Sequence, residues 1–395
     1  MTKALKHVII SIIYNKAFGE IMNLELKGLK KDEIVSLKLR KLFESYGYAQ
    51  YKMSKFEEYS FYMDNKNFLK SEQIIAFSDK SGRLMALKPD ITLSIAKNSR
   101  ASEGTSEKLY YNESVYRYAK HSKEYKEFQQ MGLEFMGKID DYQTLEIITL
   151  ALKSLEAISE DFVLDLSHMG LIAGLFELIN ITSDTEKENL LSCIVGKNSH
   201  DLEKTAASYN ISETNIALLK DVLACPNTLN EAIYFWKGVA KNDTLKCAVD
   251  DIVRLCNSFN GSSYLQKLRL DISIVNDTNY YNNLIFQGYI KNLPFMVLSG
   301  GRYDPLLHKF GRNINAMGFA LSIDELSRYF PLNKDKNEAS AVVYDTSTDI
   351  NVLCDIIEGQ RAKGYKVTAI TGNPNLENFG KVIYLTNGLA EEQYV

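Results

Sequence analysis

The chain has 395 residues, a formal net charge of −4, a hydrophobic share of 45% and a charged share of 24%. This length predicts two or three domains, and the composition is typical of a globular protein in aqueous solution. The acidic balance, with no basic stripe, argues against extended nucleic-acid binding. Because no run of 18 apolar residues is present, the sequence predicts no membrane span.

Residues 1–21 are interpreted as an extension ahead of the folded core. Their apolar run is interrupted by Asn15 and Lys16, and no small-residue cleavage site follows, which is atypical of a signal peptide. The five cysteines form no CxxC pair and have no histidine at metal-ligand spacing. We therefore expect reduced thiols in the cytoplasm and no metal site.

The first predicted helix spans about 32–46, where apolar residues recur at helical spacing on one face. Asp32 is its predicted N-cap, and Gly47 is predicted to end it. The pattern then changes, and strands are expected at 83–87 and 109–118.

The predicted strand 127–136 has two different faces. One carries Phe128, Gln130, Gly132 and Glu134, and the other carries Met131, Leu133 and Phe135. The polar face either lines a polar cavity or is solvated by bulk water, and the strand alone does not decide between the two.

A helix at 141–158 and a strand at 161–166 lead into a block, 169–262, that consists almost entirely of helical patterns. We interpret this block as an insertion. Strands then return at 268–275, 283–290 and 295–299. Because most strands are followed by turns rather than helices, an antiparallel sheet flanked by helices is predicted, and the fold class is α+β.

The last part of the chain is predicted to be a separate domain. A charged linker at 333–337 divides the core, residues 22–330, from a small C-terminal α/β domain, residues 338–395. Its expected elements are a strand at 341–344, a helix at 350–363, and strands at 367–370 and 381–385.

Three short segments carry chemically informative side chains. They are Leu87-Lys88-Pro89-Asp90-Ile91-Thr92, then Tyr116-Arg117-Tyr118 with the strand to Glu134, and Tyr280-Tyr281 with Gly300-Gly301-Arg302-Tyr303-Asp304. Together they offer carboxylates, an amide, tyrosines and permissive glycines, which suit a small zwitterion with an ammonium group and a polar ring. No catalytic triad, phosphate-binding loop or dinucleotide motif is present, so no catalytic residue is assigned.

These segments resemble the class II aminoacyl-tRNA synthetase core of histidyl-tRNA synthetase over about 24–330. The Gly-Gly-Arg-Tyr-Asp sequence is the most specific part of the resemblance. It implies an antiparallel sheet flanked by helices, with a helical insertion before the third motif.

The chain departs from the synthetase pattern where that family holds the ATP phosphates. Arg117 remains, but the resemblance places two lost phosphate-binding arginines at Glu124 and Glu325 and a lost glutamate at Ala119. It also places at Asn276 the lost arginine that holds the histidine carboxylate. Activation of an amino acid concentrates negative charge on the phosphates, so replacing two cations there by acidic residues removes stabilisation of the transition state.

The sequence Lys88-Pro89-Asp90-Ile91-Thr92 is similar to that of a second family, the regulatory subunits of ATP phosphoribosyltransferase. This resemblance implies a non-catalytic subunit of the first step of L-histidine biosynthesis. Its expected partners are a short-form catalytic subunit, a second copy of the chain within a hetero-oligomer, and histidine as feedback effector. No cofactor, tRNA or membrane partner is expected.

The resemblance also implies a histidine-binding site. Its residues would be Asp90, Thr92, Arg117, Gln130, Glu134, Tyr280, Tyr281, Gly301, Arg302 and Tyr303. Glu134 and Tyr281 would face the imidazole, Asp90 and Thr92 the α-ammonium, and Gln130 the carboxylate. Arg117 would substitute for the arginine that Asn276 replaces. The alternatives are a divergent histidyl-tRNA synthetase or another synthetase-like amino-acid sensor.

Overall fold

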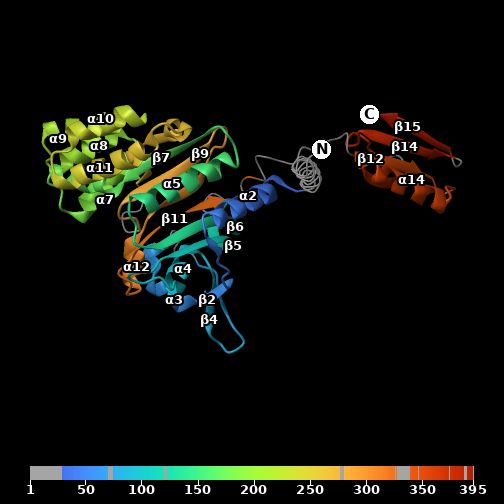
Figure 1. Ribbon diagram of the computed structural model, residues 1–395, viewed down its shortest axis with the longest axis horizontal. Coiled ribbons are helices and arrows are strands. Elements are labelled where there is room, and N and C mark those ends of the chain that lie inside the picture. The colour runs from blue at the N-terminus through green and yellow to red at the C-terminus, as the bar shows by residue number, and fades with distance from the viewer. Residues whose placement is uncertain are drawn as a thin grey trace, which may run out of the picture. The chain divides into compact units, whose positions relative to one another are not determined.

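The computed structural model describes residues 29–69, 74–119, 122–275, 280–324, 326, 339–345, 347–372, 374–386 and 389–394. These residues form two compact units that divide between residues 330 and 331 (Figure 1). The predicted extension 1–21, the linker 333–337, and the positions Asn276 and Glu325 lie outside the described residues. No helix in the described part of the chain is long and apolar enough to cross a membrane.

The first unit is built on an eight-stranded sheet with the order β1-β5-β6-β11-β10-β9-β7-β8. The strands are β1 (Ala49–Gln50), β5 (Glu107–Ala119), β6 (Glu124–Gly137), β7 (Phe162–His168), β8 (Leu268–Leu270), β9 (Leu284–Ile290), β10 (Met296–Arg302) and β11 (Asn315–Ser322). Most neighbouring strands pair antiparallel, as expected, but at the two edges β1 pairs with β5 and β7 with β8 in parallel. Both edge pairs are joined by long connections, as a parallel pair requires.

Helices cover the two faces of this sheet. On one face lie α2 (Lys31–Ser45) and α5 (Asp141–Glu156), while α3 (Tyr59–Asp64), α4 (Thr92–Asn98) and α12 (Asp304–Lys309) lie toward the other (Figure 1). A small three-stranded sheet, β2 (Phe56–Glu58), β4 (Leu84–Leu87) and β3 (Ala76–Ser78), accompanies the second group.

The ends of α2 test two sequence predictions. Gly47 follows the helix with a φ of 82°, which confirms its role in ending the helix. Asp32 is not the N-cap, because the helix begins at Lys31 and Lys30 occupies the cap position. The side chain of Glu33 instead accepts a hydrogen bond from the backbone N–H of Lys30 at 2.7 Å.

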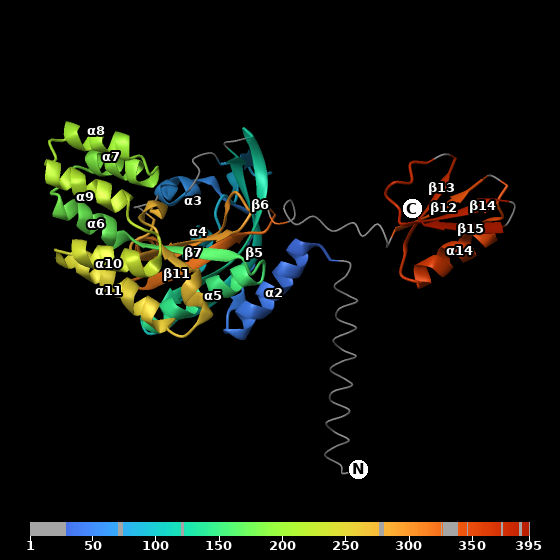
Figure 2. The same cartoon turned by 90° about the horizontal axis from the view of Figure 1, so that it is seen from above.

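Six helices lie between β7 and β8 and gather at one end of the sheet (Figure 2). They are α6 (Met169–Leu178), α7 (Asp184–Val195), α8 (Ser199–Ser208), α9 (Glu213–Leu223), α10 (Leu229–Val239) and α11 (Asp243–Ser258). His168 caps α6, since its Nδ1 accepts a hydrogen bond from the Gly170 N–H at 2.9 Å, and its Nε2 lies 3.4 Å from Asp251 Oδ2 on α11. This histidine therefore has a structural role.

The predicted strand 268–275 ends early. β8 stops at Leu270, and Asp271 then caps a short 3₁₀ turn, Ile272–Ile274, by accepting a hydrogen bond from the Ser273 N–H at 2.9 Å. The other Asp271 oxygen lies 2.7 Å from Lys197 Nζ, in the turn between α7 and α8. Asp271 thus connects the helical block, through Lys197, to the end of strand β8.

Asp165 of β7 lies near Asp271, and its raised pKa predicts that the stability of the chain depends on pH. Burial, reinforced by the negative charge of Asp271, raises the pKa of Asp165 to about 6 from its ordinary 3.8. The folded chain then binds a proton more tightly than the unfolded chain, so stability is lost as pH rises through 6. We expect Asp165→Asn to raise the free energy of unfolding at pH 7.5 by about 1–3 kcal/mol, and to have little effect near pH 4.

Denaturant unfolding at the two pH values measures this effect. Asp161→Asn is the matched control, because the Asp161 side chain is 69% exposed. Its ion pair with Lys291 Nζ, at 3.8 Å, lies at the surface and contributes little to stability. If Asp165→Asn differs from the wild type by the same free energy of unfolding at both pH values, the prediction is contradicted.

The second unit comprises β12 (Ala339–Tyr344), α14 (Ile350–Ala362), β13 (Lys366–Thr371), β14 (Lys381–Thr386) and β15 (Leu389–Tyr394). Its sheet has the order β13-β12-β14-β15, in which only β15 is antiparallel to its neighbour. Leu353 of α14 packs on Val342, Ile383 and Leu385 in a small core of its own.

Candidate functional site

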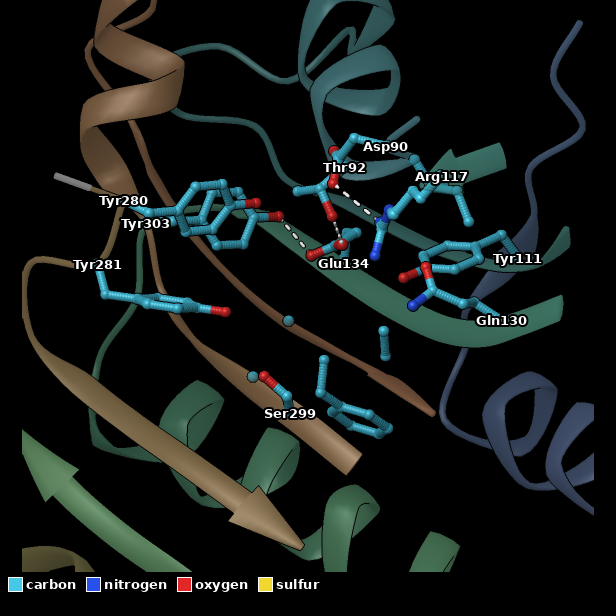
Figure 3. Close-up of a pocket in the computed structure, with 15 residues that line it drawn as sticks. Asp90, Thr92, Tyr111, Arg117, Gln130, Glu134, Tyr280, Tyr281, Ser299 and Tyr303 are labelled. Carbon is cyan, nitrogen blue, oxygen red and sulfur yellow. Dashed lines mark hydrogen bonds and ion pairs between the residues drawn. The ribbon is translucent and has the colours of Figure 1, made fainter. Parts of the chain in front are cut away.

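A small polar cavity of about 40 Å³ opens on the sheet face that carries α4. Figure 3 shows side chains from several distant segments of the chain converging on it. Most of the residues that the sequence nominated line this cavity, namely Asp90, Thr92, Arg117, Gln130, Glu134, Tyr280, Tyr281 and Tyr303.

Glu134 lies at the centre of the cavity. Its side chain is nearly fully buried, at 2% exposure. Glu134 Oε1 accepts a hydrogen bond from Thr92 Oγ1 at 2.7 Å, and Glu134 Oε2 accepts one from the Tyr303 hydroxyl (Figure 3). Gly318 faces Glu134 across the β6–β11 ladder, and a Cβ atom there would overlap the carboxylate. Glycine at this position therefore makes room for Glu134.

The sequence left open whether the polar face of the strand with Glu134 lines a cavity or is solvated by bulk water. Gln130 and Glu134 face the cavity, whereas Met131, Leu133 and Phe135 are buried in the core. The polar face of the strand is thus a cavity wall and not a solvated surface.

The turn before α4 places a second carboxylate in the cavity. Asp90 Oδ1 accepts the Leu93 N–H at 2.8 Å and so holds the first turn of the helix. Arg117 donates through Nε to the Pro89 carbonyl oxygen at 2.5 Å, and its Nη2 lies 3.7 Å from Asp90 Oδ2. The fully buried Lys88 pairs with Glu113 at 2.5 Å, which fixes the same turn to β5.

Buried tyrosines complete the wall. Burial raises the pKa of Tyr111, Tyr280 and Tyr303 well above the ordinary value, and the neighbouring carboxylate of Glu134 reinforces each shift. Their hydroxyls therefore stay protonated and can donate or accept hydrogen bonds. The ring centroids of Tyr280 and Tyr303 are 5.7 Å apart.

The charges of the cavity fit a cationic group better than an anion. Two carboxylates, Asp90 and Glu134, face it, and Arg117 is the only cationic side chain among the described residues that line it. Such a set suits an ammonium group and a ring N–H. No cluster of three or more potential metal ligands occurs within the described ranges.

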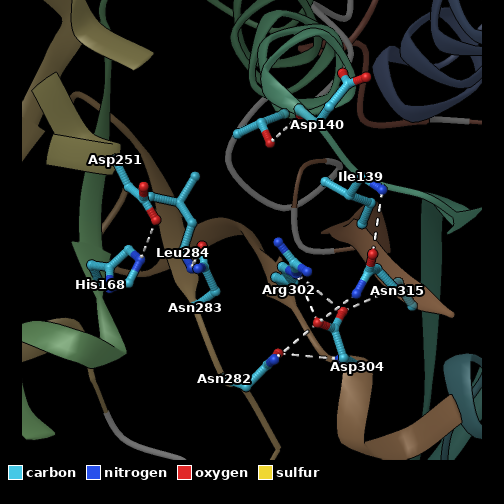
Figure 4. Close-up of polar contacts among 12 residues, drawn as sticks. Ile139, Asp140, His168, Asp251, Asn282, Asn283, Leu284, Arg302, Asp304 and Asn315 are labelled. Atoms are coloured by element: carbon cyan, nitrogen blue, oxygen red, sulfur yellow. Dashed lines mark hydrogen bonds and ion pairs between the residues drawn. The ribbon is translucent and has the colours of Figure 1, made fainter. Parts of the chain in front are cut away.

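Gly301 and Arg302 do not line the cavity, and for Arg302 the sequence-based placement is corrected. Side chains alternate along β10, so Arg302 points away from the side on which Tyr303 lies. Arg302 Nε donates to Asp304 Oδ2 at 2.8 Å. Asn282 and Asn315 bond the same carboxylate, each at 3.0 Å (Figure 4). Gly301 lies beneath Tyr281, where a Cβ atom would come within 2.6 Å of the ring.

Tyr111, Ser299 and Gly318 are among the wall residues that were not predicted from the sequence. Tyr111 shares a face of β5 with Arg117, six residues later, and this even spacing was the available signal. Ser299 likewise stands an even number of positions before Tyr303. Gly318 had no such signal, because its role depends on the pairing of β11 with β6.

Two of the altered synthetase positions lie at the end of the β5–β6 hairpin. Ala119 and Glu124 are paired across it. Glu124 is exposed, and its carboxylate lies 3.8 Å from Lys126 Nζ. The hairpin therefore presents an acidic side chain at the position where the synthetase pattern has a cation.

Comparison with known proteins places the fold among synthetase-like chains. The family model for histidyl-tRNA synthetase matches residues 21–326. An ATP phosphoribosyltransferase regulatory subunit of Alkaliphilus metalliredigens is 26% identical over 333 residues, covering 82% of this chain and 83% of the relative. A histidine–tRNA ligase of Methanococcus maripaludis is 28% identical over 330 residues, covering 82% and 78%.

Solved structures agree on the fold. A chain from Bacillus halodurans, named as an ATP phosphoribosyltransferase regulatory subunit/histidyl-tRNA synthetase, has a TM-score of 0.71 at 23% identity and covers 90% of this chain and 93% of its own. A chain of the ATP phosphoribosyl transferase (HisG:HisZ) complex from Thermotoga maritima has a TM-score of 0.58 at 16% identity, with coverages of 74% and 97%.

Proposed function

The chain belongs to the histidyl-tRNA synthetase family, and from this premise we propose that it is a non-catalytic regulatory subunit of ATP phosphoribosyltransferase. It uses the amino-acid cavity of the family to bind histidine as a feedback effector. Relatives that carry the regulatory name match most of their length to most of this chain, which supports the proposal.

The observation that carries the proposal is the combination of an amino-acid cavity with few cations. Arg117 is the one cationic side chain among the described wall residues, and the Pro89 carbonyl and Asp90 already engage it. Glu124 and, at the sequence level, Glu325 stand where the synthetase pattern has cations for a triphosphate. Ala119 replaces a glutamate of that pattern, and Asn276 replaces its arginine for the histidine carboxylate. Phosphate activation depends on such cations.

Histidine fits the groups of the cavity in one orientation. Its imidazole lies between Glu134 and Tyr281, and its α-ammonium lies at Asp90 and Thr92. Gln130 and Arg117 meet the carboxylate. Glu134 already accepts two hydroxyl hydrogen bonds, so a bound imidazole N–H replaces one of these partners or adds to them.

The catalytic groups are supplied by a partner. We propose a short-form ATP phosphoribosyltransferase catalytic subunit, bound after the chain has formed its own dimer along α2 and the β1 edge. The solved complex from Thermotoga maritima, whose matched chain has a similar fold, supports this assembly. A cytoplasmic location and the absence of tRNA and membrane partners stay predictions.

The second candidate is a divergent histidyl-tRNA synthetase, favoured by relatives that are named histidine–tRNA ligases. Histidine-dependent exchange of pyrophosphate into ATP separates the two. We expect the purified chain to give no exchange above a no-enzyme control, since each missing cation costs about 10²–10³ in rate. An active histidyl-tRNA synthetase serves as the positive control, and clear exchange by this chain would establish the second candidate.

Co-expression with the short-form catalytic subunit of the same genome tests the partner. We expect the two chains to elute together in size-exclusion chromatography and the phosphoribosyltransferase activity to rise in the complex. Separate elution at micromolar concentrations without activation would refute the proposed partnership.

A further inference from the structure

A groove separates the helical block from the core, beside the histidine cavity. The groove is lined by α6 and α7 on one side and by Tyr281, Asn282 and Pro305 on the other. Its volume is about 970 Å³, against about 40 Å³ for the cavity. Small-ligand pockets span roughly 300–1,000 Å³, so this groove has room for the side chains of a peptide segment.

The floor of the groove is apolar. Ile172 and Phe176 of α6 are 3% and 4% exposed, and Ile181 is 6% exposed. Leu191 of α7 and Pro305 continue this apolar lining. Leu191 and Pro305 are half-buried, so an occupant with apolar side chains would remove their remaining surface from water, which favours binding.

The rim of the groove is acidic. Glu177, Asp184 and Glu188 are exposed along it. Lys187 is the one cationic side chain among the described lining residues, and its Nζ lies 3.5 Å from Asp184 Oδ1. Three carboxylates against one ammonium repel a phosphate backbone and attract lysine and arginine side chains.

Tyr281 connects the groove to the cavity, because it lines both. In Figure 3 its ring lies on the side of the cavity away from Arg117 and Gln130. The ring stands over Gly301 and its centroid is 4.8 Å from that of Tyr280. A ligand that moves this ring changes the wall of the groove at the same time.

We propose that this groove is a docking surface for a cationic, partly apolar segment of the catalytic partner, and that Tyr281 couples it to histidine. This inference rests on the proposed function. Histidine can regulate the complex only by binding one state of it better than another. A side chain that contacts effector and partner together supplies that difference.

Charge reversal at the rim tests the docking surface. We expect Glu177→Lys with Glu188→Lys to weaken binding to the catalytic subunit by about tenfold or more at low salt, with a smaller effect at high salt. Asp221→Lys with Asp250→Lys makes the same charge change on exposed positions of α9 and α11 outside the groove, and is expected to bind like the wild type.

Cysteine protection gives a second readout that does not depend on weakened binding. Ala173 is exposed in the groove, so Ala173→Cys introduces a thiol there. We expect the catalytic subunit to slow maleimide labelling of this thiol at least about tenfold, while the exposed Cys247 and Cys354 stay reactive as internal references.

These measurements distinguish a failure of the proposed function from a failure of the docking surface. If the wild-type chain does not bind the catalytic subunit, the proposed function fails. If it binds, but the rim variant binds equally well and the new thiol is not protected, the docking surface lies elsewhere. Protection by transfer RNA, or by a second copy of the chain in the absence of the partner, would also overturn the inference.

Discussion

Replacing Glu134 by glutamine is expected to weaken histidine binding by about 10- to 150-fold, the worth of one charge-assisted hydrogen bond. The carboxylate is nearly fully buried and accepts hydrogen bonds from Thr92 and Tyr303. Glutamine keeps the shape but loses the charge that attracts a protonated imidazole. Titration calorimetry on the isolated chain measures the change, and the inhibitory histidine concentration of the complex should rise by the same factor.

A pH series makes this prediction specific to charge. A carboxylate favours the protonated ring, so wild-type affinity should rise as pH falls from 8 to 6, and the Glu134→Gln affinity should change less. Glu127→Gln, on the exposed part of the same strand, is the matched control. If Glu134→Gln binds and responds to histidine like the wild type, the effector site lies outside this cavity.

Replacing Gly318 by alanine is expected to reduce histidine binding more than 100-fold, because the added methyl group displaces the Glu134 carboxylate. The Cβ atom would overlap Glu134 Oε2 and the Leu133 carbonyl oxygen. The second overlap is with backbone, so β6 and β11 must also separate locally. We expect the free energy of unfolding to fall by about 1–3 kcal/mol. Calorimetric titration and denaturant unfolding measure the two effects.

Gly238→Ala is the control for an added methyl group. Gly238 lies in α10 with nothing within 4 Å of its Cβ position. Alanine there is expected to stabilise the chain by about 0.5–1 kcal/mol and to leave histidine binding unchanged. A Gly318→Ala variant that binds histidine normally would mean that Glu134 does not need its present position.

The Gly-Gly-Arg-Tyr-Asp segment has two structural roles that its sequence did not separate. Tyr303 reaches into the cavity and donates to Glu134. Arg302 and Asp304 form the polar cluster on the other side of the strand, where Asp304 also accepts the Ala316 N–H at 3.0 Å. The resemblance had assigned Arg302 to the ligand, but the alternation of the strand directs it to this cluster, which holds Tyr303 in place.

Features that depend on local periodicity could be predicted without the structure. The two faces of residues 127–136, the stop at Gly47 and the helical character of the block after His168 follow from spacing along one element. The family resemblance and the losses at Ala119 and Glu124 were also readable from residue identities alone.

Which of these residues contact one another depends on how distant segments of the chain pack together. Thr92 and Tyr303 bond Glu134 across 42 and 169 residues of chain, and the parallel edges of the sheet and the space at Gly318 likewise depend on strand pairing. The groove that shares Tyr281 with the cavity depends on how the helical block packs against the core. Such contacts are set by register and packing between distant segments, and local periodicity carries no information about either.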